Sequence, residues 1–335
     1  MSVGVNVAVR SLWAPSQTHV AILLSVGYAL FVVFFPWELV SRGGFPDFDG
    51  YVETFDYFKL AGESRISMYE LSTVTEYLVN EVLWNELIIW LQNMTGSAVI
   101  ALRIASFFIL FVSSLFIFKH VGYRVAPLFL FNPSVIDVSM SGIRNGLAWS
   151  LIIIALWNRS KLIRVGFFLV GMFIHSTTLA LFFLYYSTQL ANRLLKGKAL
   201  LITGLAAGIF LGVGLTFLNE LVLGVIGDRR SGLDYVVGGD SFRLASIWAI
   251  LLYFQCTSGH DYIRRNIFVI ALLAWYQIMN PYIPGSYRIW AALFPVVALS
   301  MIDLPAHKRK IFLFLYSGYL AIQWFYWSKI FNLFI

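Results

Sequence analysis

The stretch VAILLSVGYALFVVFFPW, from Val20 to Trp37, carries no charge over a length that can span the roughly 30 Å hydrocarbon core of a bilayer. Comparable apolar stretches recur from there to the C-terminus. Because backbone groups in lipid must be satisfied within their own segment, these stretches predict helices, and the ten-residue alternation of membrane strands is absent. With 59% hydrophobic and 12% charged residues among 335, the sequence predicts an all-α polytopic membrane protein.

The run from Val20 to Trp37 predicts an anchor that stays in the protein. It is too long and too aromatic at its end for a signal peptide, and no small-residue cleavage site follows it. The single cysteine, Cys256, excludes an intramolecular disulfide and a thiolate cluster. The net charge of +7 marks membrane topology in a chain of this kind, so we expect no nucleic-acid partner.

Short loops rich in Lys and Arg predict the cytoplasmic side. With Arg10 they hold 14 of the 24 Lys and Arg residues, and they lie at residues 119–124, 159–164, 193–198, 264–265 and 308–310. The segment 38–97 instead has ten acidic residues against three basic ones. We expect this segment to be an external, periplasmic loop, with an amphipathic helix over Glu76–Gln92 along the membrane surface.

If every basic loop lies inside, the chain crosses the membrane an even number of times between one basic loop and the next. Two of these intervals are short for two full spans. Val125–Trp157 contains Asn132-Pro133 and the Ser141-Gly142 break, and Val165–Leu190 has His175 at its middle. We interpret both as short hairpins of broken helices with tips at Arg144 and His175. Such helices are tolerated only where they line a cavity within the protein.

The predicted architecture is a single transmembrane domain over residues 1–335 with about ten crossings, including the two broken-helix hairpins. Later spans are expected near residues 200–226, 242–255, 267–279, 288–301 and 311–329. An alternative topology passes residues 165–186 across once and inverts everything after them. It would place the basic loops 193–198 and 308–310 outside, so the charge distribution disfavours it.

Two arginines lead directly into apolar runs on the predicted external side: Arg144 in MSGIRNGLA and Arg288 in PGSYRIW. A guanidinium at a membrane span costs a few kcal/mol even on lenient scales, so it is usually retained to meet an anion or to line a wet cavity. Neither arginine has a carboxylate within several residues in the sequence. Because arginine binds phosphate in a planar fork, the two predict a clamp on a diphosphate.

Other external residues could join this site. His175 could act as a general base, or it could be a neutral histidine hydrogen-bonded inside a helix kink; Asp49 is a second candidate base. Three further arginines either bind the anion or pair with Asp228, Asp234 and Asp240 of the same loop: Arg229, Arg230 and Arg243. We expect neither a metal site nor a cofactor, because DFDGY at 47–51 lacks the spaced ligands of a calcium loop and no phosphate-binding glycine loop is present.

The segments IRNGLAWSL at 143–151 and FIHST at 173–177, joined through a basic turn, resemble the EpsG group of Wzy-type polysaccharide polymerases, the O-antigen and exopolysaccharide polymerases. The resemblance extends to DGY at 49–51 with Phe55, to Glu81 ahead of an apolar helix, and to Tyr287-Arg288 with Pro295. Two departures are Asn145, where glutamine is common, and the lack of a proline after Glu81.

The resemblance implies a GT-C-like glycosyltransferase in the bacterial inner membrane, without metal or cofactor. It would move a growing glycan from undecaprenyl diphosphate to the non-reducing end of the next lipid-linked repeat unit, on the periplasmic face. Its partners would be undecaprenyl-diphosphate-linked oligosaccharides, the lipid bilayer and a chain-length regulator. The candidate catalytic residues are His175, Arg144, Arg288 and Asp49. The candidate substrate-binding residues are Asp47, Tyr51, Glu81, Arg229, Arg230, Tyr235, Arg243 and Tyr287.

Three other functions remain open. An O-antigen ligase-like glycosyltransferase would share this architecture, although its long external loop is typically late in the chain rather than early. A flippase for lipid-linked oligosaccharides would need charged residues along a path between both faces, whereas the predicted ones lie on one side. An acyltransferase would use a buried histidine without several arginines.

Overall fold

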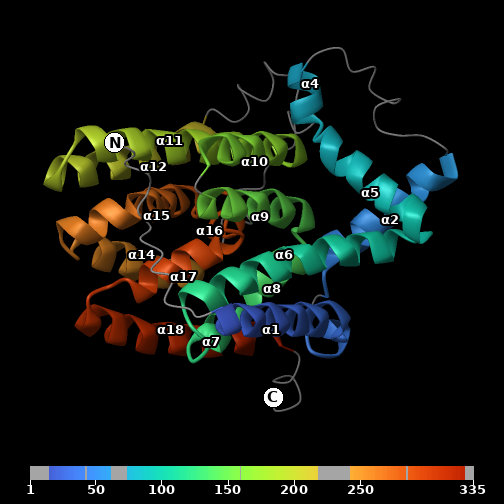
Figure 1. Cartoon of the computed structure of the whole chain (residues 1–335), viewed down its shortest axis with the longest axis horizontal. Helices are drawn as coiled ribbons and strands as arrows, with labels where there is room; N and C mark the ends of the chain where they lie inside the picture. The colour runs from blue at the N-terminus through green and yellow to red at the C-terminus, as the bar shows by residue number, and fades with distance from the viewer. Residues whose placement is uncertain are drawn as a thin grey trace. The chain divides into compact units, whose positions relative to one another are not determined.

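The computed structural model describes residues 15–41, 44–61, 74–158, 160–217, 242–283 and 286–328. Regular structure in these residues is helical, apart from one isolated bridge between Ser41 and Ser328, and the predicted all-α class is confirmed (Figure 1). The chain divides into two compact units. The first comprises residues 15–178 and the segment from 320, and the second comprises residues 179–319. The division falls within α18 (Ala306–Trp327).

The first unit is a stack of apolar helices. Within it α6 (Ala98–His120) contacts α1 and α9, and α9 (Ile143–Trp157) contacts α10 (Lys161–Ile174), so the order α1, α6, α9, α10 can be followed in Figure 1. The remaining elements of this unit are α1 (Pro15–Phe34), η1 (Trp37–Leu39), α2 (Pro46–Ala61), α4 (Val74–Val79), α5 (Val82–Thr95), α7 (Ala126–Leu130) and α8 (Pro133–Met140).

The helices of the predicted hairpins break where the sequence predicts it. Asn132 caps α8, because its side chain accepts a hydrogen bond of 2.9 Å from the backbone N–H of Ser134, and Pro133 begins the helix. At Ser141-Gly142 the chain bends by 105° between α8 and α9. α10 ends at Ile174, since His175 takes an extended backbone with φ −152° and ψ 119°.

The predicted amphipathic helix over Glu76–Gln92 is wrong as a single helix. The structure has two helices there, α4 and α5, separated by a turn at Asn80 and Glu81. Glu81 has φ +53°, the left-handed region, and a continuous right-handed helix cannot pass through a residue in that conformation. Apolar periodicity on both sides of the turn conceals this break in the sequence.

The second unit contains α11 (Thr177–Leu194), which begins in the first unit, followed by α12 (Gly197–Phe217), α14 (Phe242–Cys256), α15 (His260–Met279), α16 (Arg288–Ala291), α17 (Phe294–Ile302) and most of α18. Its most extensive helix contact joins α12 to α15. Glycines on α12 permit this approach: a Cβ added to Gly208 would lie 2.1 Å from the carbonyl oxygen of Ala271. Small residues at four-residue spacing are typical of tightly packed helices in membranes.

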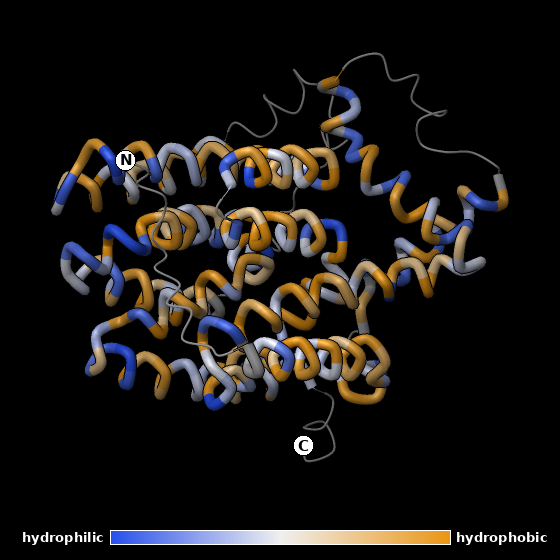
Figure 2. The backbone as a smooth tube through the Cα atoms, viewed as in Figure 1, coloured by the Kyte–Doolittle hydropathy of each residue, from blue (hydrophilic) through white to orange (hydrophobic). Residues whose placement is uncertain are grey.

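The described helices suit a membrane, but about ten crossings are not confirmed. Only α6 and the Gly197–Thr216 part of α12 are long and apolar enough to cross alone, with the bent pair α8 and α9 as a third if it forms one span. The breaks divide other apolar runs into shorter helices, and α15 and α18 begin with charged residues that lower their hydropathy. Figure 2 shows hydrophobic residues along the helices and hydrophilic ones concentrated near turns.

Candidate functional site

A buried carboxylate joins two candidate catalytic residues in the first unit. Glu81 Oε2 accepts a hydrogen bond from Arg144 Nη1, and Oε1 lies 2.5 Å from His175 Nδ1. The side chain of Glu81 is 1% exposed, that of His175 9% and that of Arg144 22%. Because an ionised carboxylate only accepts hydrogen bonds, Nδ1 of His175 is the donor of this contact when Glu81 is ionised.

The backbone at Glu81 is held in an unfavourable conformation. Outside glycine, Glu81 is the one described residue with positive φ, and a side chain in the left-handed region costs roughly 1–3 kcal/mol. Asn85, which is buried, stabilises the turn: its Nδ2 donates to the carbonyl oxygens of Asn80 at 3.2 Å and Glu81 at 3.1 Å. Strain of this kind concentrates at functional sites, where the surrounding structure enforces it.

Two glycines bring the helices of the site close together. A Cβ on Gly146 of α9 would lie 3.0 Å from Ile109 Cδ1 of α6 and 3.3 Å from the Val138 carbonyl oxygen of α8. A Cβ on Gly171 of α10 would lie 3.3 Å from the Ala148 carbonyl oxygen of α9. The start of α9 and the end of α10 are thus tightly packed, and these are the ends that carry Arg144 and His175.

Aromatic side chains line the site next to Arg144. The guanidinium carbon of Arg144 lies 5.9 Å from the ring centroid of Tyr51 on α2, within the range of a cation–π contact. Tyr51 packs edge-on against Trp84 of α5, with ring centroids 5.5 Å apart. Four segments therefore meet at the site: α2, the turn between α4 and α5, the start of α9 and the end of α10.

Buried polar atoms beside the two catalytic candidates have no hydrogen-bond partner within the described part of the chain. They are Asn145 Oδ1, next to Arg144, and the hydroxyls of Thr177 and Thr178, which follow His175. A buried polar group without a partner is uncommon and costs free energy, so such groups are expected to meet a ligand or water. Hydroxyl and amide groups suit a polyhydroxylated ligand.

The site lies at the end of α9 opposite the basic loops of this unit. Arg144 and Trp157 are at the two ends of α9, about 20 Å apart at 1.5 Å per residue. Lys119 lies over the ring of Trp157, with Nζ 4.8 Å from its centroid, and His120 packs edge-on against the same ring at 5.3 Å. The C-terminal ends of α6 and α9, where Lys119 lies, are therefore on one side, and the Glu81 site is on the other.

The remaining predicted site residues are not all brought to this place. Asp47 and Asp49 are on α2 with Tyr51; Asp47 is one helical turn from Tyr51 on the same face, whereas Asp49 is exposed. Tyr287 and Arg288 belong to the second unit, at the start of α16, and Arg243 is in the first turn of its α14. Arg229, Arg230 and Tyr235 lie outside the described residues.

The structure gives Arg144 a carboxylate partner that is distant in the sequence. This partner is Glu81, 63 residues away, so the absence of a carboxylate near Arg144 in the sequence still holds. In the sequence, Glu81 is a candidate site residue only through the family resemblance, and Asn85 is not a candidate. Asn85 could have been suspected as one of two polar residues, with Gln92, on the buried side of α5, but only the backbone angle of Glu81 explains what it does.

No group of three or more His, Cys, Asp or Glu side chains suited to a metal ion occurs among the described residues. In comparisons with protein families, curated proteins and solved structures, nothing matches this chain.

Proposed function

We propose that this protein is a membrane glycosyltransferase of the polymerase type, which extends a polyprenyl-diphosphate-linked glycan. The observation that carries the proposal is the buried Glu81 carboxylate that binds both His175 and Arg144. Glu81 thereby holds a group that can accept a proton, His175, close to a permanent cation, Arg144. A proton acceptor and a cation are the two requirements for transferring a sugar from a diphosphate leaving group.

In this mechanism His175 is the general base. An acceptor hydroxyl attacks the anomeric carbon of the donor sugar, its proton passes to Nε2 of His175, and the bond from the anomeric carbon to the phosphate oxygen breaks. The bonding electron pair leaves with the diphosphate. Glu81 fixes the tautomer through Nδ1 and stabilises the imidazolium that forms, as a carboxylate behind a catalytic histidine does in other enzymes.

Arg144 would stabilise the departing diphosphate. Its side chain is 22% exposed while its partner Glu81 is 1% exposed, so Arg144 is the more accessible member of the pair. Protonation of His175 changes the formal charge of the three side chains from zero to +1, which favours an anion at the moment when the leaving group acquires its charge. Arg288, which belongs to the second unit, stays a candidate diphosphate-binding residue on the sequence argument alone.

The acceptor sugar would lie among Tyr51, Asn145 and the threonines after His175. The aromatic face of Tyr51 and the unpartnered atoms of Asn145, Thr177 and Thr178 suit a sugar ring and its hydroxyls. The distribution of charge supports an external, periplasmic site in a bacterial inner membrane, since the Glu81 site is at the end of α9 opposite Lys119 and Trp157. The proposal keeps the expected architecture of about ten crossings in a GT-C-like arrangement. Two pairs of these crossings would be the broken-helix hairpins.

The proposal is tested by deleting the gene and examining the surface glycan. We expect single repeat units on the normal anchor, with complementation by the wild-type gene restoring polymer and complementation by His175→Ala failing to do so. Loss of all glycan would indicate translocation of the repeat unit instead, and full-length polymer that is not attached to its anchor would indicate a ligase; either result contradicts a polymerase. Purified protein with a lipid-linked repeat unit should form polymer without added metal.

A further inference from the structure

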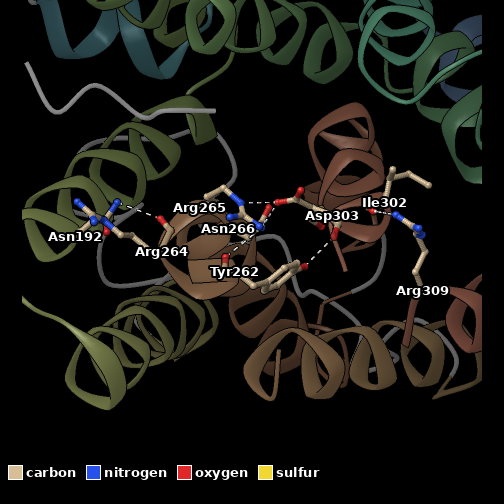
Figure 3. Close-up of polar contacts among 9 residues, drawn as sticks. Asn192, Tyr262, Arg264, Arg265, Asn266, Ile302, Asp303 and Arg309 are labelled. Carbon is tan, nitrogen blue, oxygen red and sulfur yellow. Dashed lines mark hydrogen bonds and ion pairs between the residues drawn. The ribbon is translucent and has the colours of Figure 1, made fainter. Parts of the chain in front are cut away.

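Three turns of the second unit, far apart in the sequence, meet at one end of that unit. Asn192 at the end of α11 donates a hydrogen bond of 3.1 Å to the carbonyl oxygen of Arg264, and the backbone N–H of Gly197 donates to His260 Nδ1 at 3.0 Å. Arg265 Nε then lies 2.9 Å from Asp303 Oδ2, which joins the start of α15 to the end of α17 (Figure 3).

Further hydrogen bonds make this end rigid. Tyr262 donates to the carbonyl oxygen of Ser300 at 2.8 Å, and burial raises the pKa of Tyr262, so its hydroxyl remains a donor. Arg309 Nη1 donates to the carbonyl oxygen of Ile302 at 2.8 Å, and Lys308 Nζ donates to that of Thr257 at 2.6 Å (Figure 3 shows the first of these two). The turns α11–α12, α14–α15 and α17–α18 thus form one connected surface, here called the basic end.

The basic end has a large excess of positive charge. Between residues 192–198, 260–265 and 303–310 there are eight Lys and Arg residues against two Asp residues, a formal net charge of +6. One aspartate, Asp303, is already paired with Arg265. Six of the cations are exposed: Arg193, Lys196, Lys198, Arg264, Arg265 and Lys310. The second aspartate, Asp261, is exposed at the same end, so the two carboxylates offset only part of this charge.

Exposed apolar side chains lie one helical turn inward from these cations. Lys198 and Ile202 are four residues apart on α12, Lys310 and Phe314 four apart on α18, and Arg193 and Leu190 three apart on α11, so each pair shares a helix face. The apolar members are strongly exposed, at 64% for Ile202, 79% for Phe314 and 57% for Leu190. The surface therefore changes from cationic to apolar within about 6 Å along the helices.

We propose that the basic end binds anionic phospholipids, with the headgroup phosphates on Arg193, Lys198 and Lys310 and the acyl chains along Leu190, Ile202 and Phe314. This order of charge and apolar surface matches a phospholipid, whereas a soluble acidic protein would leave the apolar residues uncovered. Basic residues next to membrane helices attract anionic headgroups by about 1 kcal/mol each. The inference does not depend on the proposed catalytic function.

The test compares wild-type protein with the triple variant Arg193→Gln, Lys198→Gln, Lys310→Gln in nanodiscs of phosphatidylcholine containing phosphatidylglycerol. Native mass spectrometry of the released protein measures the ratio of the two lipids retained. We expect wild type to prefer phosphatidylglycerol and the variant to lose that preference by at least about tenfold, from three lost attractions. The charge-preserving variant Arg193→Lys, Lys198→Arg, Lys310→Arg should behave as wild type.

Two results would overturn the inference. One is equal retention of phosphatidylglycerol by wild type and the Gln variant, with both proteins showing the same helical content and thermal unfolding in pure phosphatidylcholine. The other is displacement of phosphatidylglycerol from wild type by soluble poly-glutamate, which would identify the basic end as a surface for an acidic protein. Because the readout is lipid retention, a failure of the glycosyltransferase proposal would leave this test unaffected.

Discussion

Oε1 of Glu81 lies 2.5 Å from Nδ1 of His175, although the two residues are 94 positions apart in the chain. With Glu81 ionised, Nδ1 donates in this contact, and the proposed mechanism assigns proton transfer to Nε2. A neutral histidine hydrogen-bonded inside a helix kink would make the same contact but would not need Nε2. The two interpretations of His175 can therefore be separated by one variant that removes Nε2 alone and one that removes both ring nitrogens.

His175→Asn retains a donor near the position of Nδ1 but removes Nε2, and His175→Ala removes both. If Nε2 is the general base, both variants should lose polymerising activity by roughly 10²- to 10⁴-fold. His175→Asn should keep more thermal stability, because the Glu81 contact survives. Polymer length on a gel and melting temperature of the purified protein are the measurements. Near-normal activity in His175→Asn would show that the histidine is structural.

Arg144→Lys preserves the charge but loses the planar fork. If Arg144 binds the diphosphate through that fork, the polymer should shorten or disappear while the amount of protein in the membrane stays normal. The same result is expected for Arg288→Lys. A cation that only anchors a helix at the interface would tolerate lysine, which reaches the interface by extending its stem. Lys59→Arg, at an exposed position on α2, is the matched control. Full-length polymer from both Arg→Lys variants would exclude the clamp.

Asn85→Ala removes both hydrogen bonds that stabilise the left-handed turn at Glu81. The Glu81 carbonyl oxygen keeps the backbone N–H groups of Trp84 and Asn85 as donors, but the loss of both side-chain hydrogen bonds should still lower the free energy of unfolding by about 1–3 kcal/mol and displace the Glu81 carboxylate. Asn93→Ala, at an exposed position of the same helix, should change stability by less than about 0.5 kcal/mol. Thermal unfolding in detergent compares them; equal melting temperatures would contradict the stabilising role of Asn85.

Gly208→Ala should destabilise the contact between α12 and α15. Its new Cβ would lie 2.1 Å from the Ala271 carbonyl oxygen, and overpacking of this kind costs about 1–3 kcal/mol. Gly214→Ala on the same helix meets no atom within 4 Å, so it should be neutral or stabilise by up to about 1 kcal/mol through helix propensity. Melting temperatures of the two variants should move apart, and a Gly208→Ala protein as stable as wild type would count against this packing.

Cysteines at the basic end should all behave alike toward an impermeant thiol reagent, because the three turns are joined by hydrogen bonds. In a Cys256→Ser background, Lys196→Cys and His307→Cys are expected to resist the reagent from outside and to react after membrane permeabilisation, as the positive-inside rule predicts. If both cysteines react from outside, the predicted membrane orientation of this unit is wrong. Labelling of one alone would contradict the structure of the basic end itself.

Several features could be predicted from the sequence because they depend on local composition. Unbroken apolar length predicts helices, and Asn132-Pro133, Ser141-Gly142 and the polar residues after Ile174 interrupt them where the structure has breaks. The single helix expected over Glu76–Gln92 failed, since the left-handed angle of Glu81 is enforced by its surroundings rather than by its own residue type. The count of crossings was not confirmed for a related reason: apolar length alone does not show whether two short helices form one span.

The sequence by itself determined that this is a helical, membrane-suited chain, with basic turns and with arginines and a histidine at helix breaks, because charge and hydropathy act residue by residue. Only the tertiary structure decided that Glu81 is the partner of both Arg144 and His175. Pairing across 63 and 94 residues depends on the tight packing of α9 with α6, α8 and α10 at Gly146 and Gly171. A buried charge is stable only when such packing brings its partners within hydrogen-bond distance, and no local pattern specifies that.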